Sequence, residues 1–139
     1  MAKGRIRRPE DQPWQTSSVR KDRDFAHVIL EDGGPASAYR IREPGTETDP
    51  QLVELRFHPG EEVELHCHDE PEIMYILFGS MKLGSRTLGA GTSIFIAGGV
   101  FYGFIAGPQG VHFLNFRSHI DTSFHLPDRR QFVDTGAAQ

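Results

Sequence analysis

The sequence predicts an all-β fold, a jelly roll or barrel of short strands in a single domain. Fifteen glycines and nine prolines among 139 residues favour frequent turns, and no segment repeats its apolar residues with a helical period. Eight to ten short stretches that favour strands lie between these turn signals, which is typical of sandwiches and barrels. The length suits one domain with one core.

The predicted strands are runs of β-branched and aromatic residues bounded by glycine, proline and acidic turns. Their ranges are 25–30, 36–43, 51–58, 72–78, 80–84, 86–88, 93–97, 100–106 and 111–117. Strand alternation places Met74, Ile76 and Phe78 on the face that also carries Glu72.

The chain divides into three parts. Residues 1–24 form a polar, charged N-terminal arm that Trp14 could anchor, residues 25–117 form the β-barrel, and residues 118–139 form a polar C-terminal tail. Open jelly rolls leave strand edges that pairing would cover. We therefore expect a homodimer, to which the arm could contribute a strand.

Composition excludes several classes of protein. A net charge of −4 without a basic stripe argues against a nucleic-acid partner. No apolar run reaches membrane-spanning length, and the basic N-terminus lacks the hydrophobic region of a signal peptide. The lone cysteine, Cys67, excludes an internal disulfide and fits a reducing compartment. We expect a cytoplasmic protein with a small-molecule substrate.

Residues 60–79 carry a candidate metal site. Gly60, His66, His68, Glu72 and Gly79 stand at fixed spacing in a stretch that otherwise favours strands. Side chains at i and i+2 of a strand share a face, so the two histidines project together. After a short polar turn, Glu72 opens the next strand and can face both imidazoles across the hairpin.

Two histidines and one carboxylate with open positions opposite suit Fe(II) oxygen chemistry or a catalytic zinc. The alternative interpretation is two exposed strand histidines and a solvated glutamate.

This spacing resembles the first conserved motif of the cupin superfamily, and the match is complete. The second cupin motif is a glycine, five residues, proline, one residue, glycine, two residues and histidine. Here Gly91 and Gly99 keep the register, while Ala97 replaces the proline and Tyr102 replaces the histidine. The resemblance covers about residues 50 to 117.

Cupin resemblance implies a double-stranded β-helix, a homodimer and one divalent metal ion per chain. Iron is the first choice, with zinc, nickel or manganese as alternatives. The implied ligands are His66, His68 and Glu72, with Tyr102 at the position of the missing histidine.

Tyr102 has three possible roles. It could be a phenolate ligand that favours ferric iron, because a bound cation favours deprotonated ligands. It could be an acid, base or hydrogen-bond donor beside a three-ligand metal, or an aromatic that fills the barrel. His58 and His112 are the other nearby histidines that could substitute as a ligand.

Arg56 is a second candidate catalytic residue. If its face of strand 51–58 points inward, it could clamp a carboxylate or an enolate oxygen. Otherwise Arg56 covers the outer face or a subunit contact. Asn115 and Arg117 could likewise point either into the barrel or outward.

Cupins are functionally broad, so the resemblance implies a class of chemistry and not one reaction. It favours a metal-dependent enzyme, first of all a Fe(II) dioxygenase-type enzyme acting on a small oxygenated or enolisable substrate. The alternatives are a redox-neutral lyase, isomerase or cyclase, in which the metal acts as a Lewis acid and Tyr102 moves the proton, and a non-catalytic ligand-binding cupin.

Overall fold

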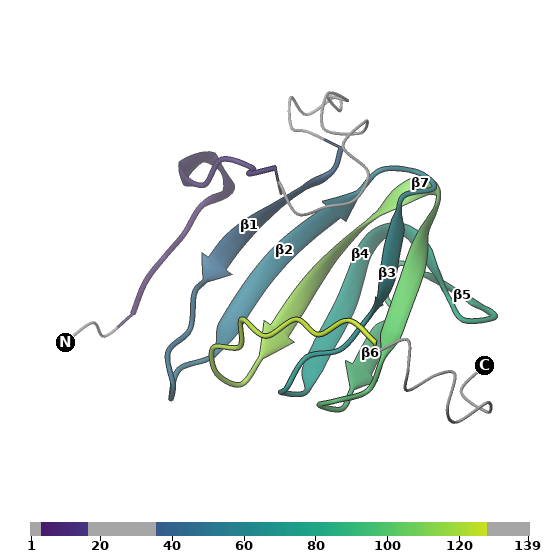
Figure 1. The fold of residues 1–139 in the computed structure, drawn as a ribbon. Helices are drawn as coiled ribbons and strands as arrows, with labels where there is room; N and C mark the ends of the chain where they lie inside the picture. Colours follow the sequence, from purple (N-terminus) through teal and green to yellow (C-terminus); the bar gives the residue numbers. More distant parts are fainter. Residues whose placement is uncertain (1–3, 17–35, 128–139) are drawn as a thin grey trace.

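The computed structural model describes residues 4–16 and 36–127, which are almost entirely β (Figure 1). A 3₁₀ turn, η1 (Pro9–Asp11), precedes the strands, and no α-helix occurs in these two ranges. The strands are β1 (Ala38–Glu43), β2 (Gln51–Phe57), β3 (Glu62–His66), β4 (Glu72–Leu83), β5 (Arg86–Gly89), β6 (Ser93–Ile96) and β7 (Tyr102–Arg117). The predicted strand 25–30 lies outside the described residues.

All pairings are antiparallel, and the two long strands β4 and β7 run through both layers of the fold. In the first layer, the later part of β7 pairs with β2, the early part of β4 pairs with β6, and β1 lies at the edge beside β2. In the second layer, the early part of β7 pairs with β3 and the later part of β4 pairs with β5. The all-β prediction is therefore confirmed.

The predicted strands 100–106 and 111–117 are one strand, β7, which continues through the sequence Gly107–Gly110. Bulges in the β4–β7 ladder mark the place where the pair passes between the layers. The backbones approach so closely there that a Cβ atom added to Gly79 would lie 2.0 Å from the carbonyl oxygen of Gly110. A side chain at position 79 is therefore excluded by this contact as well as disfavoured by the positive φ of 75°.

The core lies between the layers. Met74, Ile76 and Met81 of β4 are almost fully buried, and Phe57 packs edge-on against Phe104, with ring centroids 5.1 Å apart. The expected alternation stops at a bulge after Ile76. Phe78 is consequently 56% exposed instead of pointing inward with Glu72.

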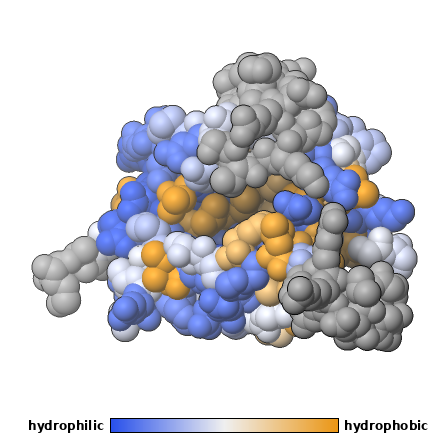
Figure 2. All heavy atoms as spheres, in the orientation of Figure 1, coloured by the Kyte–Doolittle hydropathy of each residue, from blue (hydrophilic) through white to orange (hydrophobic). Residues whose placement is uncertain are grey.

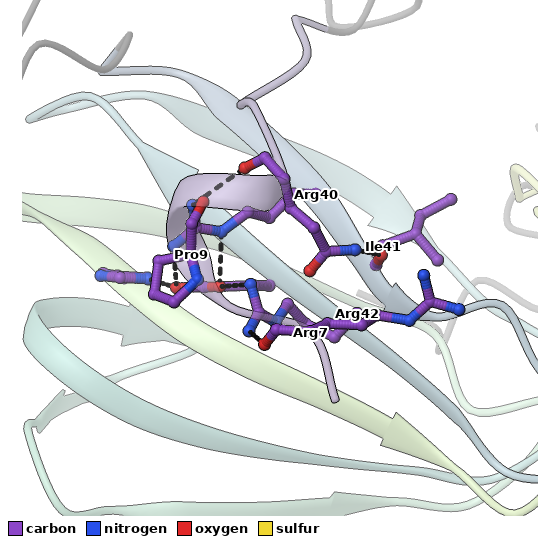
Figure 3. Close-up of polar contacts among 8 residues, drawn as sticks. Arg7, Pro9, Arg40, Ile41 and Arg42 are labelled. Carbon is purple, nitrogen blue, oxygen red and sulfur yellow. Dashed lines mark hydrogen bonds and ion pairs between the residues drawn. The ribbon is translucent and has the colours of Figure 1, made fainter. Parts of the chain in front are cut away.

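The N-terminal arm lies along β1 of its own chain. Gln15 and Tyr39 exchange two backbone hydrogen bonds of 2.8 Å. Arg42 donates to the carbonyl oxygen of Arg7 at 2.7 Å, and Gln12 donates to that of Ile41 at 2.8 Å (Figure 3). These contacts tie the arm to the edge of the first layer.

Trp14 anchors the arm on the outer face of that layer. The guanidinium groups of Arg40 and Arg56 lie 4.0 and 4.2 Å from its ring centroid. Beside them, Glu54 accepts hydrogen bonds from Arg40 at 2.8 Å and from His112 at 2.6 Å. The rest of this face, on β4, β6 and β7, exposes the apolar side chains of Ile73, Tyr75, Leu77, Phe95 and Phe116. The homodimer stays a prediction.

In the described part of the chain, no helix has the length and apolar character that a membrane span requires.

We expect Gly79→Ala to destabilise the chain more than Gly84→Ala. Both glycines have positive φ, so alanine at either position costs about 1–2 kcal/mol. Nothing lies within 4 Å of a Cβ atom at Gly84, whereas the clash with Gly110 at Gly79 adds roughly 1–3 kcal/mol. Urea unfolding followed by circular dichroism measures both losses. Equal losses would contradict the close approach of β4 and β7.

Candidate functional site

A cavity of about 380 Å³ opens between the two layers. Its walls come from β1, β2 and β3, from both ends of β7 and from the segment 121–124. The space-filling view shows apolar atoms gathered in a hollow between hydrophilic margins (Figure 2). His66, His68 and Tyr102 line this cavity, so three of the predicted site residues meet at one place.

The two histidines stand where β3 ends. His66 is the last residue of β3 and pairs with Tyr102, the first residue of β7. The imidazole centroids of His66 and His68 lie 4.9 Å apart, as their i and i+2 spacing predicts. The ring of Tyr102 lies 4.5 Å from that of His66.

Backbone carbonyl groups fix the tautomers of both imidazoles. The Nδ1 atom of His66 lies 2.8 Å from the carbonyl oxygen of Glu64, and Nδ1 of His68 makes a short hydrogen bond to the carbonyl oxygen of Ser123. A carbonyl oxygen only accepts, so each Nδ1 carries a proton, and in the neutral ring this leaves the lone pair on Nε2. Burial also lowers the pKa of His66 and favours its neutral form. Neutral imidazoles oriented through Nδ1 are the form that binds metals.

Glu72 lies behind Tyr102 and Arg117, which line the cavity while Glu72 does not. Its side chain is almost fully buried. Tyr102 donates a hydrogen bond to Oε1 of Glu72, and Arg117 donates to Oε2 at 2.7 Å. Burial and the Glu72 carboxylate both raise the pKa of Tyr102. Tyr102 is therefore a neutral phenol that donates a hydrogen bond to a carboxylate.

Because of these contacts, no three His, Cys, Asp or Glu side chains within residues 4–16 and 36–127 converge on one point suited to a metal ion. The donor set nevertheless fits a divalent metal. Both Nε2 atoms are available, and Oε2 of Glu72 lies 3.7 Å from Nε2 of His68. Two donors at about 2.1 Å from one ion are separated by roughly 3.0–3.6 Å at angles of 90–120°. A small turn of Glu72 away from Arg117 would bring it into such a set.

The C-terminal segment covers the site, which the sequence alone did not indicate. Phe124 stacks on His66, with centroids 4.7 Å apart and planes 12° from parallel. Arg117 donates to the carbonyl oxygen of Asp121 at 2.6 Å, and Cys67 and His125 exchange two backbone hydrogen bonds of 2.9 Å. The sequence signal was slight, because Phe124 is only one of two phenylalanines in the polar tail 118–139.

The structure does not bring Arg56 to the site. Arg56 lies on the outer face of β2 against Trp14, while Val53, Leu55 and Phe57 face the cavity. His112 is also on the outer face, bonded to Glu54, and His58 is not part of the cavity wall. Neither His58 nor His112 therefore replaces the histidine that the second motif lacks. Asn115 and Arg117, in contrast, do face the cavity.

Comparison with known proteins agrees with this geometry. No family model matches the chain. Among curated proteins, oxalate decarboxylase OxdC of Bacillus subtilis (strain 168) is 32% identical over 75 residues, which are 54% of this chain. The match spans only about a fifth (20%) of the length of that relative.

Two solved structures share the fold. An RmlC-like cupin protein from Ralstonia eutropha JMP134 superposes with a TM-score of 0.59 at 13% identity, covering 81% of this chain and 66% of that one. This chain has the cupin fold. The polyketide cyclase RemF from Streptomyces resistomycificus superposes with a TM-score of 0.55 at 23% identity, covering 74% and 80% of the two chains. The proteins that this chain resembles thus include a decarboxylase and, by fold, a cyclase, and its predicted metal ligands differ from the full cupin pattern at Tyr102.

We expect His68→Gln to weaken zinc binding by this chain by more than about 100-fold, because loss of a ligand should exceed the 10–100-fold cost of losing an outer partner. Isothermal titration of the metal-free chain with Zn²⁺ measures the affinity. His119→Gln is the control, since His119 is a partly exposed histidine that pairs with Glu70. Equal affinities of the two variants would contradict the site.

We expect the iron-loaded chain, oxidised in air, to show no tyrosinate-to-iron absorption band. Tyr102 keeps its proton because it donates to Glu72. The visible spectra of the native chain and of Tyr102→Phe should therefore coincide at equal iron content. A band that disappears in Tyr102→Phe would instead make Tyr102 a phenolate ligand.

Proposed function

We propose that this cupin is a metal-dependent enzyme that moves a proton on a small oxygenated, enolisable substrate, in a redox-neutral lyase, isomerase or cyclase reaction. One observation carries the proposal. The neutral phenol of Tyr102 lines the cavity beside His66 and His68 and donates to the buried carboxylate of Glu72. A phenol with a carboxylate behind it is a proton-transfer pair.

The residues divide the work as follows. His66 and His68, with Glu72, would hold the metal, which when bound polarises substrate oxygen atoms as a Lewis acid. Tyr102 takes the substrate's acidic C–H proton while its phenolic proton passes to Oε1 of Glu72, so no free phenolate forms. The return of the proton reverses these two transfers. Arg117 holds the carboxylate through Oε2, a contact that Glu72 would give up on turning toward the metal.

A second candidate is Fe(II) dioxygenase-type cleavage of the same class of substrate. Two histidines and a carboxylate are the donor set that non-haem iron oxygenases use, with open positions for the substrate and O₂. Tyr102 would serve there in the same proton transfer. The two functions differ in their need for oxygen.

The test uses α-tetralone, an aromatic ketone with slowly exchanging α-hydrogens, and the zinc-loaded chain in D₂O under nitrogen. We expect the chain to exchange the α-hydrogens faster than zinc in buffer alone does. Tyr102→Phe should lower this exchange rate about 100-fold, which is within the usual contribution of a general acid or base. Tyr75→Phe is the control, because Tyr75 is exposed on the outer face of β4. Proton NMR measures the exchange.

Three other results would change the conclusion. Unchanged exchange in Tyr102→Phe would remove Tyr102 from the chemistry. Oxygen uptake by the iron-loaded chain without exchange under nitrogen would favour the dioxygenase. Neither activity with a tightly bound metal would leave a ligand-binding cupin.

A further inference from the structure

The cavity is elongated and has two chemically different ends. It follows β3 from Glu61 to His66, a length of about 16 Å at roughly 3.3 Å per residue. One end holds His66, His68, Tyr102 and Arg117, and the other holds Glu61.

Between these ends the walls are mostly apolar, with Gln51 and Asn115 as polar exceptions. Val53, Leu55 and Phe57 of β2 face Val63 of β3 and Phe104 and Phe113 of β7. These side chains hold a flat apolar body by contact alone, because they offer no hydrogen bonds.

The positive charge of the cavity wall lies at the histidine end, and the carboxylates of Glu62, Glu64 and Asp121 also line the cavity. Arg117 and the proposed metal supply positive charge at the histidine end. Glu61 occupies the far end, almost fully buried, where it accepts hydrogen bonds from the hydroxyl of Ser37 and the N–H of His58, each at 3.0 Å. A second anionic group there would lie against a carboxylate.

The volume sets the size of the ligand. A cavity of about 380 Å³ would hold roughly a dozen waters at ~30 Å³ each, so a two-carbon acid would leave most of it unfilled.

We propose that the ligand of this cavity is an elongated aromatic molecule of about two or three fused rings with one acidic or enolic head group. Its head lies at His66, His68 and Arg117, and its apolar body lies between β2 and β3. That this ligand is the substrate rests on the proposed function.

The test compares two aromatic acids that share one head group with a two-carbon diacid. Titration calorimetry on the zinc-loaded full chain uses 1-hydroxy-2-naphthoate, salicylate and oxalate. The two aromatic acids differ only in the second ring, so their difference measures the apolar walls. We expect the naphthoate to bind at least about 10-fold more tightly than salicylate or oxalate.

A matched pair of variants locates the bound molecule. Ile41 lines the cavity from β1 and is 42% exposed, while Ile73 is 43% exposed on the outer face of β4. We expect Ile41→Asn to weaken binding of the naphthoate about 5-fold or more and Ile73→Asn to change it by less than about 2-fold. Their similar exposure makes the comparison independent of folding.

Each outcome decides the proposal. Equal affinity for the naphthoate and salicylate, tighter binding of oxalate, or no effect of Ile41→Asn would overturn it. Naphthalene-2,6-dicarboxylate binding as tightly as 2-naphthoate would overturn the single head group. If the chain binds no metal but keeps the preference for the naphthoate, the proposed function fails and the ligand class stands. If metal binds without that preference, the ligand class fails alone.

Discussion

The carboxylate of Glu72 joins the two ends of β7. Tyr102 is the first residue of this 16-residue strand and Arg117 is the last, and both donate hydrogen bonds to Glu72. An ionised carboxylate as buried as this one is stable only with such partners. A strand whose ends meet at one side chain must bend, and β7 does so between the two layers. The bend that allows these contacts also brings the site residues of β3, β4 and β7 together.

The bend depends in turn on the close contact between Gly79 and Gly110. β4 turns with β7, so the start of β4 lies in one layer and its end in the other. The glycine that ends the first motif thus has a structural role, while the histidines and the glutamate are the residues for which we propose a chemical one. Structure and site share one short stretch of sequence because the same strand crossing supports both.

Local periodicity predicted much of this arrangement. The i and i+2 spacing placed His66 and His68 together, and alternation correctly separated Arg56 from Val53, Leu55 and Phe57. Alternation does not say which face is inward, and that depends on the opposite layer, which contributes Val63 and Phe104. Burial of three apolar side chains outweighs the inward placement of one guanidinium, which finds Trp14 outside.

Other features depended on contacts between distant parts of the chain. Phe78 faces outward because a bulge shifts the register of β4 against β7. The local sequence pattern did not predict this bulge. The interval Gly107–Gly110 looked like a turn, yet β7 runs through it as one strand, and its register against β4 shifts there. Phe124 stacks on His66 from a segment more than fifty residues later, which no local pattern predicts.

Replacing the second-motif histidine by Tyr102 changes what the site can do. A histidine there would contribute a further ring nitrogen to the metal, whereas the Tyr102 phenol turns to Glu72 and leaves that position open. The metal would keep more free positions for substrate oxygens, and the cavity gains a proton donor beside them. The same substitution draws the carboxylate toward Tyr102 and Arg117, which weakens its hold on a metal. Such a site would bind its metal more weakly than one with a fourth ligand, but it contains a proton-transfer pair. This favours acid–base chemistry on a polarised substrate.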